Sequence, residues 1–595
     1  MKSDFQPLKP MNSETRNCRN CKTEFTIEPD DFSFYEKIQI PPPAKCPDCR
    51  FQARLSFRNN RVFYKRQCAL CGAGMLTVYH PSSPFTVYCR ECWLSDKWDP
   101  MQYGRPYDFS IPFFAQFQSL QRTVPRPNLY RTNFQNSDYC NYGLDFKDCY
   151  LLFGGRYNER VHFANQIFNS HDSFDIAYSS QVEFGYELFE CRRVNRLFYS
   201  HHSNDCLNSY YLVDCHNCQN CFGCVNLRNK QYHIWNVPHA KEEYEAFLRG
   251  ANVGSYTAHQ GFSARLRELV EKNPRRYAHI LKGLNSDGDD IYEVKNVHDS
   301  FASGEAEDSR FLFYLQNKSK DCYDCSFQGW NAEKLYQICH GFGGMNVQFG
   351  VRNLYNQDAL YNEECHNSAN IFGCEGLRKK QYCVLNVQYP KEEYESLKEK
   401  IIEHMKKTGE WGEFFPIALS PFAYNETIAQ EFFPLIKESA ITTGFTWRED
   451  AVRNYQITLA TERISDDIKG VPDSVLSEVV ACAHGGACLH QCTTAFKITK
   501  EEIQFYRSMS LPLPRLCPNC RHYERLGQRN PLKLWKRQCM CNEVTSDKDQ
   551  VTNKYKNTAA HFHGNSPCSN EFKTTYAPER KEIVYCEQCY QAEVA

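Results

Sequence analysis

Cysteine pairs spaced as C-x2-C constrain this chain more than any other feature. The first hundred residues hold four of these pairs: Cys18/Cys21, Cys46/Cys49, Cys68/Cys71 and Cys89/Cys92. A C-x2-C turn directs two thiolates at one ion, and two such turns complete a tetrahedral site. We therefore predict two closed zinc sites of four cysteines each, with a structural role. An iron site or disulfides are the alternatives.

The end of the chain repeats this arrangement. CPDCRFQARLSFRNNRVFYKRQC at 46–68 returns as CPNCRHYERLGQRNPLKLWKRQC at 517–539, and VYCREC returns as VYCEQC. Two more zinc sites are predicted here, giving about four Zn²⁺ ions in all. The predicted C-terminal ligands are Cys488, Cys492, Cys517 and Cys520 for one site, and Cys539, Cys541, Cys586 and Cys589 for the other. Any of Cys482, Cys568, His490, His561 and His563 could replace one of them.

A row of arginines joins the two sites of each module. The residues are Arg50, Arg54 and Arg58 in the first copy, and Arg521, Arg525 and Arg529 in the second. Spacing of four places them on one face of a helix, which we expect to end near Asn59-Asn60 and before Pro531. Guanidinium groups pair well with phosphate oxygens, so this face predicts contact with nucleic acid. The alternative is a solvated face that pairs with local carboxylates such as Glu524.

Charge is unevenly spread along the chain. Residues 1–100 hold 15 Lys and Arg against 11 Asp and Glu, and residues 479–595 hold 16 against 11. The whole chain has a net charge of −1, so the middle is acidic. This distribution favours the ends as the parts that meet a polyanion.

The 32 cysteines also bear on the cellular compartment. The first residues, MKSDFQPLKPMNSETRN, contain no apolar run, and no window resembles a membrane helix. We expect a cytoplasmic protein without membrane association, and reduced thiols there favour metal ligands over disulfides.

The middle of the chain contains a second duplication. CHNCQNCFGCVNLRNKQYHIWNVPHAKEEYE begins at Cys215, and CHNSANIFGCEGLRKKQYCVLNVQYPKEEYE begins at Cys365. Short runs of Tyr, Phe, Val and Ile alternate with Asn, Asp, Gly and Ser, and similar motifs recur at roughly 20–25 residues. This pattern predicts a parallel β-solenoid, with a β-sandwich or propeller as the alternative.

Four cysteines in the first copy, Cys215, Cys218, Cys221 and Cys224, could form a cluster. The second copy has Ser368 and Ile371 at the middle positions, which a four-thiolate site would not tolerate. Stacked structural cysteines are therefore favoured over a fifth zinc site. The segments 241–250 and 391–409 are predicted to be helices that cap the two halves.

The predicted fold class is mainly β with flanking helices: a central parallel β-solenoid of two duplicated halves between tandem zinc ribbons. The predicted domains are a double zinc ribbon at 1–100, a connector at 101–137, solenoid halves at 138–238 and 286–389 separated by a helical insert at 239–285, a helix and connector at 390–478, and a second double ribbon at 479–595.

Several motifs carry a resemblance to known families. The stretch from Cys18 to CPDCR at 46–50 resembles the short "probable zinc-ribbon" domain of bacteria. FYRSMSLPLPRLCPNCRHYERLGQRNPLKLWKRQC, IPFFAQFQSLQRTVPRPN and EHMKKTGEWGEFFP are similar to long, uncharacterised, cysteine-rich double-zinc-ribbon proteins of candidate-phyla-radiation (Patescibacteria) bacteria. The resemblance covers almost the whole chain. It implies zinc ribbons and indicates no activity.

Two classes of function follow from these patterns. The first is a zinc-binding scaffold whose basic ribbon faces contact nucleic acid, a ribonucleoprotein or another protein. The second is a β-solenoid enzyme, of carbohydrate-active or other type, with the ribbons as docking or dimerisation caps. The sequence contains no GxSxG, Walker or Gly-rich dinucleotide motif, so no catalytic residues are assigned and the first class is favoured.

Overall fold

The computed structural model describes residues 12–449, 455–541, 555–564 and 566–594, and the chain divides into two compact units. Unit 1 holds the chain up to Leu129 together with Ala278–Arg448, and unit 2 holds Tyr130–Tyr277 together with the chain from Glu449. Unit 1 thus combines the beginning of the chain with the second duplicated segment. Unit 2 combines the end of the chain with the first duplicated segment. Strands make up 34% and helices 24% of the structure, which is a mixed fold with large parallel sheets.

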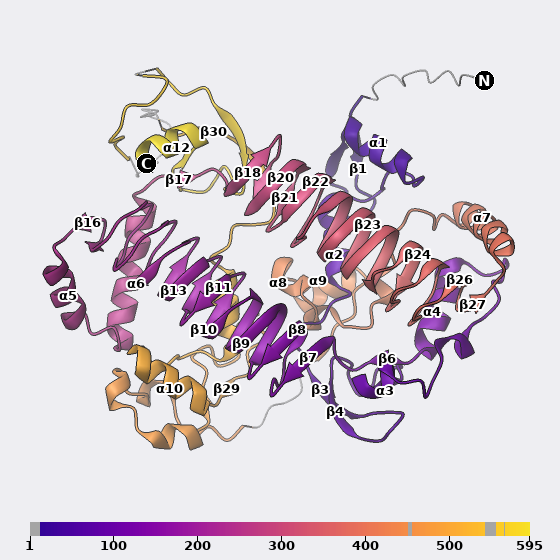
Figure 1. Cartoon of the computed structure of the whole chain (residues 1–595), viewed down its shortest axis with the longest axis horizontal. Coiled ribbons are helices and arrows are strands. Elements are labelled where there is room, and N and C mark those ends of the chain that lie inside the picture. The colour runs from indigo at the N-terminus through magenta and orange to yellow at the C-terminus, as the bar shows by residue number, and fades with distance from the viewer. Residues whose placement is uncertain (1–11, 450–454, 542–554, 565, 595) are drawn as a thin grey trace. The chain divides into compact units, whose positions relative to one another are not determined.

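Each unit contains one large parallel sheet (Figure 1). The first sheet, in unit 2, consists of β7 (Arg131–Gln135), β8 (Asn141–Lys147), β9 (Tyr150–Phe168), β10 (His171–Ala177), β11 (Ser180–Glu183), β12 (Tyr186–Phe189), β13 (Arg192–His201) and β14 (Leu207–Tyr210). The second sheet, in unit 1, consists of β18 (Ile280–Leu284), β20 (Ile291–His298), β22 (Gly304–Arg310), β23 (Ser319–Leu354), β24 (Gln357–Glu363), β25 (Ala369–Phe372), β26 (Gln381–Val384) and β27 (Val387–Gln388). The short strands β19 (Gly288–Asp289) and β21 (Ser300–Phe301) pair beside it.

The parallel pairing repeats at a step of twelve residues. Arg131 pairs with Gly143, Asn141 with Phe153, and Arg192 with Asn204. The second sheet keeps the same step over most of its length, with a step of 11 residues where Ile280 pairs with Ile291 and a step of 13 where Ala306 pairs with Ser319. The recurrence of roughly 20–25 residues seen in the sequence therefore corresponds to two steps rather than one.

Every third residue along the first sheet is buried, and the residue before each buried position often has a positive φ. Asp145, Asp148 and Leu151 have φ of 56°, 52° and 51°, ahead of buried Phe146, Cys149 and Leu152. Left-handed backbone is costly for most residues, and Asn and Asp tolerate it best. This explains why Asn and Asp are so frequent between the apolar positions.

Serine and cysteine at the buried positions join neighbouring steps through their side chains. The Ser179 hydroxyl donates to the carbonyl of Ala177 at 2.9 Å and accepts the N–H of Cys191 at 3.0 Å. The Cys206 thiol donates to the carbonyl of Asn204 at 3.2 Å. Because these small polar groups are all hydrogen-bonded, their burial carries little penalty.

Both sheets end in the same way. The antiparallel hairpins β15 (His233–Ile234) with β16 (Val237–Pro238), and β26 with β27, are followed by α5 (Lys241–Gly250) and α7 (Lys391–Thr408). The rings of Tyr244 and Tyr394 are buried against Tyr232 and Tyr382 of the last strands or turns. The two predicted helices thus cover the sheet ends. In unit 2, α6 (Tyr256–Glu271) and β17 (Arg275–Arg276) follow.

The N-terminal module, residues 12–94, is built from short hairpins and helices. Its elements are β1 (Glu14–Asn17), β2 (Glu24–Ile27), α1 (Pro29–Lys37), α2 (Pro47–Leu55), β3 (Tyr64–Gln67), β4 (Gly74–Thr77), β5 (Val87–Tyr88) and α3 (Arg90–Leu94). α4 (Phe113–Thr123) follows, and then β6 (Arg126–Pro127), which pairs with β5.

The C-terminal module, residues 480–594, repeats this order. Its elements are β28 (Val480–Ala481), β29 (Ala495–Phe496), α10 (Lys500–Met509), α11 (Pro518–Leu526), β30 (Trp535–Gln538), β31 (Glu571–Thr574), β32 (Val584–Tyr585) and α12 (Glu587–Val594). β17 pairs with β32 as β6 pairs with β5. The connectors contain α8 (Ala429–Phe432), α9 (Lys437–Thr442) and short 3-10 turns.

Candidate metal centres

Two clusters of four cysteines lie in the N-terminal module. The structure brings together Cys18, Cys21, Cys46 and Cys49, and separately Cys68, Cys71, Cys89 and Cys92, as the spacing predicts. The Sγ atoms of Cys21 and Cys46 are 3.6 Å apart, and those of Cys71 and Cys89 are 3.9 Å apart. Metal–sulfur bonds of about 2.3 Å in a tetrahedron place the sulfurs about 3.8 Å apart. The clusters therefore have the dimensions of metal sites.

Each cluster combines a thiol whose pKa is lowered with one whose pKa is raised. The side-chain hydrogen bond with Cys49 raises the pKa of Cys46, and burial raises that of Cys89. The side-chain hydrogen bond with Cys46 is the main cause that lowers the pKa of Cys49 to about 5, against the effect of burial. Burial also opposes ionisation of Cys68, but backbone N–H groups of Cys71 and Cys89 outweigh it and lower the pKa of Cys68 to about 6. The thiolate is the form of cysteine that binds metal.

The first C-terminal cluster differs from the prediction in one ligand. It contains Cys482, Cys492, Cys517 and Cys520, so Cys482 takes the place that the sequence analysis gave to Cys488. Backbone bonds show the reason: the Cys482 N–H donates to Thr494 at 2.9 Å as the Cys18 N–H donates to Thr23. Cys482 is thus the equivalent of Cys18, and seven inserted residues separate it from its partner cysteine.

The second C-terminal cluster also exchanges one ligand. It contains Cys539, Cys568, Cys586 and Cys589, with Cys568 where Cys541 was predicted. Cys568 Sγ lies 3.8 Å from Cys589 Sγ and 4.0 Å from Cys586 Sγ. The Cys539 N–H donates to the carbonyl of Asn570, just as the Cys68 N–H donates to the carbonyl of Ala73. Cys568 is therefore the equivalent of Cys71, and a long insertion separates it from Cys539 in the sequence.

The remaining candidate donors fall into two groups. His561 is engaged by Glu593, with Nε2 2.8 Å from Oε1, and is not in the cluster of Cys539. The other donors lie beside the clusters; they are His563, Cys541, Cys488 and His490. His563 Nε2 is 3.5 Å from Cys589 Sγ, and Cys488 Sγ is 3.8 Å from Cys520 Sγ.

The arginines of the C-terminal module are bound within unit 2. Arg521 and Arg525 both pair with the fully buried carboxylate of Asp175, in β10 of the first sheet, and the Arg525 contact is 2.9 Å. The guanidinium of Arg529 lies 4.8 Å from the ring centroid of Tyr178. Arg529 follows the end of α11 rather than lying on it, because the helix stops at Leu526.

The N-terminal arginines make the equivalent contacts within unit 1. Arg50 and Arg54 pair with the fully buried Asp324 of β23, at 2.9 and 2.8 Å, and Arg58 lies 3.9 Å over the ring of Phe327. Burial opposes the charge of Arg50, but attraction to Asp324 outweighs it and raises the pKa of Arg50. α2 stops at Leu55, before the predicted end at Asn59.

Aromatic contacts complete this repeated interface. Phe505 of α10 stacks on Phe174 with ring centroids 4.4 Å apart, and Phe34 of α1 stacks on Tyr323 at 3.9 Å. Each module therefore docks on the side of one parallel sheet through the same set of contacts. The short sequence repeated at both ends is the docking element of two equivalent units.

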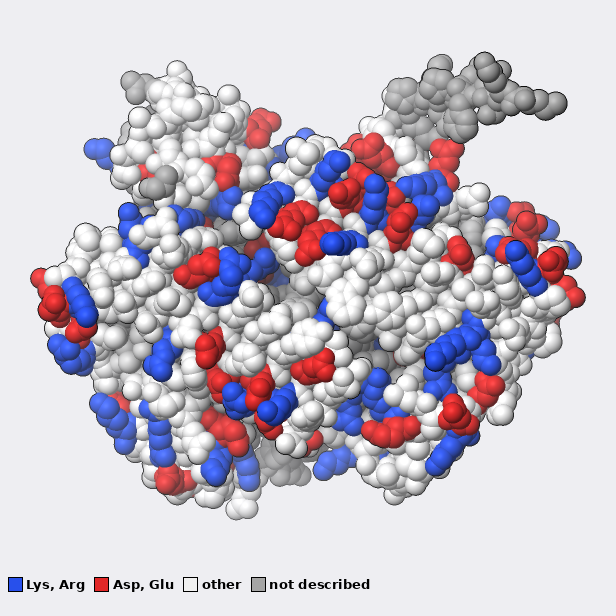
Figure 2. Space-filling view, in the orientation of Figure 1, with Lys and Arg blue, Asp and Glu red and all other residues white. Residues whose placement is uncertain are grey.

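These contacts change the interpretation of the arginine row. The side chains of Arg50, Arg54, Arg58, Arg521 and Arg525 are buried, with at most 4% exposed, and Arg529 is half-buried. An internal carboxylate occupies the place expected of a phosphate, so the prediction of a phosphate-contacting face has no support in this geometry. On the face shown in Figure 2, basic and acidic side chains are interspersed.

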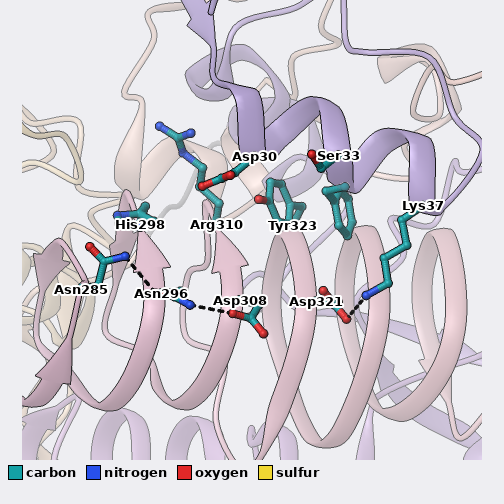
Figure 3. Close-up of a pocket in the computed structure, with 11 residues that line it drawn as sticks. Asp30, Ser33, Lys37, Asn285, Asn296, His298, Asp308, Arg310, Asp321 and Tyr323 are labelled. Carbon is teal, nitrogen blue, oxygen red and sulfur yellow. Dashed lines mark hydrogen bonds and ion pairs between the residues drawn. The ribbon is translucent and has the colours of Figure 1, made fainter. Parts of the chain in front are cut away.

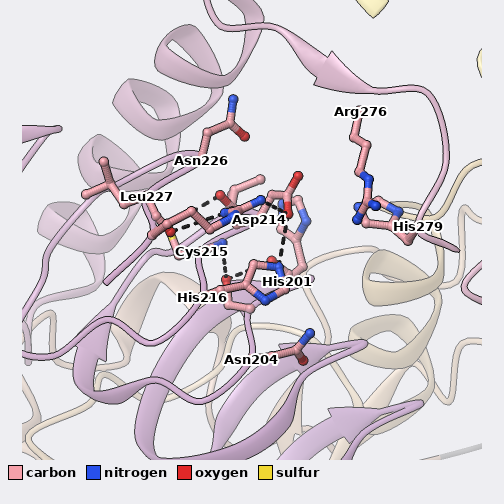
Figure 4. A network of polar contacts seen from close by, with 12 residues as sticks. His201, Asn204, Asp214, Cys215, His216, Asn226, Leu227, Arg276 and His279 are labelled. Carbon is pink, nitrogen blue, oxygen red and sulfur yellow. Dashed lines mark hydrogen bonds and ion pairs between the residues drawn. The ribbon is translucent and has the colours of Figure 1, made fainter. Parts of the chain in front are cut away.

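A further polar network lies around Asp214, in the segment that follows β14 (Figure 4). The hydroxyl of Tyr590, in α12, donates to Asp214 at 2.6 Å, and Arg228 and His216 lie 3.2 and 3.4 Å from the same carboxylate. Tyr590 is fully buried there. The module is thus held to the sheet at both of its cysteine clusters.

The cysteines Cys215, Cys218, Cys221 and Cys224 occupy four successive buried positions of the first sheet. The Cys215 thiol lies 3.5 Å from the carbonyl of Val213, and that of Cys218 lies 3.4 Å from the carbonyl of His216. Burial is the first cause that raises the pKa of Cys215. The side chain of Cys218 also interacts with the thiols of Cys206, Cys215 and Cys221. The role of these cysteines as stacked structural thiols therefore stays a prediction.

Substitution of Cys218 by serine tests this role. We expect Cys218→Ser to change the free energy of unfolding by less than about 1 kcal/mol, because a hydroxyl can replace the thiol as donor. Ser368 occupies the duplicate position and donates to the carbonyl of His366 at 3.1 Å. The variant should keep the metal content of the parent in elemental analysis. A loss of one metal equivalent would show that the four cysteines bind an ion.

A polar pocket of about 480 Å³ lies beside α1 in unit 1 (Figure 3). Several of its charged groups are engaged: Lys37 pairs with Asp321, Asp308 accepts from Asn296 at 2.9 Å, and Arg310 pairs with Asp31. Side chains committed to these contacts are poorly placed for proton transfer. The enzyme alternative therefore gains no support from this pocket.

Known proteins offer no closer guide. No protein-family model matches the chain, and no curated protein matches it. None of the helices in the described part of the chain has the length and apolar character needed to cross a membrane.

Proposed function

We propose that this protein is a zinc-stabilised interaction scaffold of the cytoplasm, in which two β-solenoids each carry a double zinc ribbon. The step of twelve residues that prevails in both sheets, with about every third residue buried, supports coils that have four sides of three residues. Stacked coils of this kind form a rigid rod-like body with repeated outer faces.

Zinc is the metal that best fits the clusters. The single observation that carries the proposal is the set of four-cysteine groups with sulfurs 3.6 to 4.0 Å apart, which matches closed tetrahedral zinc sites. A closed shell of four thiolates leaves no position for substrate or water, so these ions have a structural role. In each of the two units, they shape a module that docks on a sheet.

The outer faces of the sheets are the surfaces available to a partner. Exposed side chains pair across neighbouring steps, such as Arg160 with Asp172 and Lys147 with Glu159. Because positive charges such as these are compensated by negative neighbours, these faces suit a protein partner better than a polyanion. Nucleic acid or a ribonucleoprotein is the less favoured partner, since the arginine rows are engaged internally.

Metal analysis of the purified full chain tests the zinc proposal. We expect at least four zinc equivalents per chain, retained after dialysis without chelator. Two or fewer would contradict the assignment of a double site to each module.

Binding assays with RNA and DNA test the nature of the partner. We expect no tight binding of the full chain at about 50 mM salt. Binding that falls steeply between about 50 and 200 mM salt would contradict a scaffold whose arginines are used internally.

A further inference from the structure

The insertion in the first C-terminal cluster carries metal-binding side chains of its own. Between Cys482 and Cys492 the sequence is AHGGACLHQ, whereas only two residues separate Cys18 from Cys21. His484, Cys488 and His490 lie in this insertion, and their donor atoms and Cys520 Sγ all lie within 4.8 Å of one another. Cys520 is therefore shared between two groups of four donors.

Both histidines of the insertion have a ring nitrogen that could coordinate a metal ion. The Nδ1 atoms of His484 and His490 are buried and have no hydrogen-bond partner. The opposite ring nitrogen of His484, Nε2, faces the carboxylate of Glu524 at 3.7 Å. A carboxylate behind a histidine is the usual support for a metal ligand. Glu524 corresponds to Ala53 in the N-terminal module, which lacks these histidines.

We propose that the C-terminal module holds a second zinc ion at this cluster, bound by His484, Cys488, His490 and Cys520, with the Cys520 thiolate bridging two ions. This inference rests on the proposed zinc-binding function. Two cysteines and two histidines form a common zinc ligand set. A thiolate sulfur has lone pairs for two ions, and the Cys520 sulfur lies 3.8 Å from both Cys482 Sγ and Cys488 Sγ.

Charge also favours the second ion. A single Zn²⁺ with four thiolates has a net charge of −2, and its neighbour Cys488 would remain a separate thiol. Five thiolates, two neutral imidazoles and two Zn²⁺ ions sum to −1, which is easier to hold in a half-buried site. The second ion also supplies a partner for both unpaired imidazole nitrogens.

The second C-terminal cluster shows a related but incomplete arrangement. His563 Nε2 lies 3.3 Å from Cys541 Sγ and 3.5 Å from Cys589 Sγ, and Cys589 corresponds to Cys520 as the last cysteine of its cluster. The thiols of Cys539 and Cys568 also interact with Cys541, so these donors are partly those of the cluster itself. One ion at each of the four clusters and one at the bridged site give five zinc ions for the full chain.

Native mass spectrometry of the zinc-loaded full chain counts these ions. We expect five in the parent and four in both His490→Ala and Cys488→Ser. Folding is not at risk in these variants, because the N-terminal module forms its cluster without the insertion. His239→Ala is the matched control and should keep five, because His239 is a partly exposed histidine that pairs with the exposed Glu243 of α5, away from the cysteines of the module. With Co²⁺ in place of zinc, the two variants should lose one ion with mixed nitrogen and sulfur ligands.

The two proposals fail in different ways. A parent chain with four ions, unchanged in His490→Ala and Cys488→Ser, would overturn the bridged site and leave the zinc function standing. A chain that binds no zinc at all would overturn both. A loss of ions in His239→Ala equal to that in His490→Ala would also overturn the bridged site.

Discussion

Replacement of Asp175 by asparagine should lower the free energy of unfolding of unit 2 by about 3–5 kcal/mol. The carboxylate is fully buried and pairs with both Arg521 and Arg525. Asparagine keeps the shape and the tolerance for the positive φ of 55° at this position, but it removes the negative charge that the two guanidinium groups share. For a counter-charge, Arg521 then depends on its longer contact with Glu502, and Arg525 on its contact with Glu187. Urea denaturation of the full chain, followed by circular dichroism, measures the effect.

Asp205→Asn is the matched control for this prediction. Asp205 also has a positive φ, 57°, and pairs with Arg193, but both side chains of that pair are more than 40% exposed. An exposed pair contributes at most about 1 kcal/mol. If Asp175→Asn and Asp205→Asn destabilised the protein equally, the buried carboxylate would not be what holds the module to the sheet. Asp324→Asn should have the same large effect on unit 1.

Removal of zinc should unfold the cysteine modules while the parallel sheets keep their structure. Immediately around the first N-terminal site, the buried cluster consists of Cys18, Cys46 and Cys49 with Phe25 packed against it, so apolar packing contributes little at that end of the module without the ion. Structural zinc contributes on the order of 10 kcal/mol or more to the folding of small zinc domains. Hydrogen exchange with mass spectrometry, before and after chelation, should show lost protection in α2 and α11 and retained protection in β9 and β23.

A single-site variant separates the effect of zinc from that of the chelator. Cys49→Ser should lose one zinc ion and the exchange protection of α2, whereas Cys149→Ser, within the first sheet, should lose neither. Protection in α2 that survived complete loss of zinc would mean that docking on the sheet, rather than the metal, maintains the module. Return of zinc, but not of Mg²⁺, should restore the protected state.

The cysteine spacing predicted the N-terminal clusters because each pair of ligands lies within one tight turn. The same reasoning left one ligand open in each C-terminal cluster, with Cys482 and Cys568 among the possible replacements, because insertions separate Cys482 from Cys492 and Cys539 from Cys568. Cys488 and Cys541 lie closer in sequence to Cys492 and Cys539, at spacings that resemble C-x2-C. Only the backbone bonds that recur between the two modules identify the equivalent positions.

The step of the parallel sheets could not be predicted from the sequence. Helices and strands are recognised by apolar periods of 3.6 and 2, and this body has a period of three, so it matches neither. Buried serines and cysteines weaken the apolar signal further, because the backbone of the next step satisfies them. The duplication and the short strand-like runs indicated a repeat but not its step.

The role of the arginine rows could not be deduced from the sequence either. A helix face with arginines four residues apart is equally compatible with phosphate, solvent or a buried carboxylate. The partners Asp175 and Asp324 lie more than 250 residues away along the chain from their arginines. Aspartate is frequent in this part of the sequence, so nothing distinguishes Asp175 and Asp324 from the other aspartates.

The crossed pairing of modules and sheets has a consequence for synthesis on the ribosome. The N-terminal module emerges first but must wait for residues beyond Asp324 before it can dock, and the first sheet remains without its module until the last residues are made. Contacts between such distant segments form slowly, and exposed apolar faces persist in the interval. The early binding of zinc by the N-terminal module would keep that segment folded during the delay.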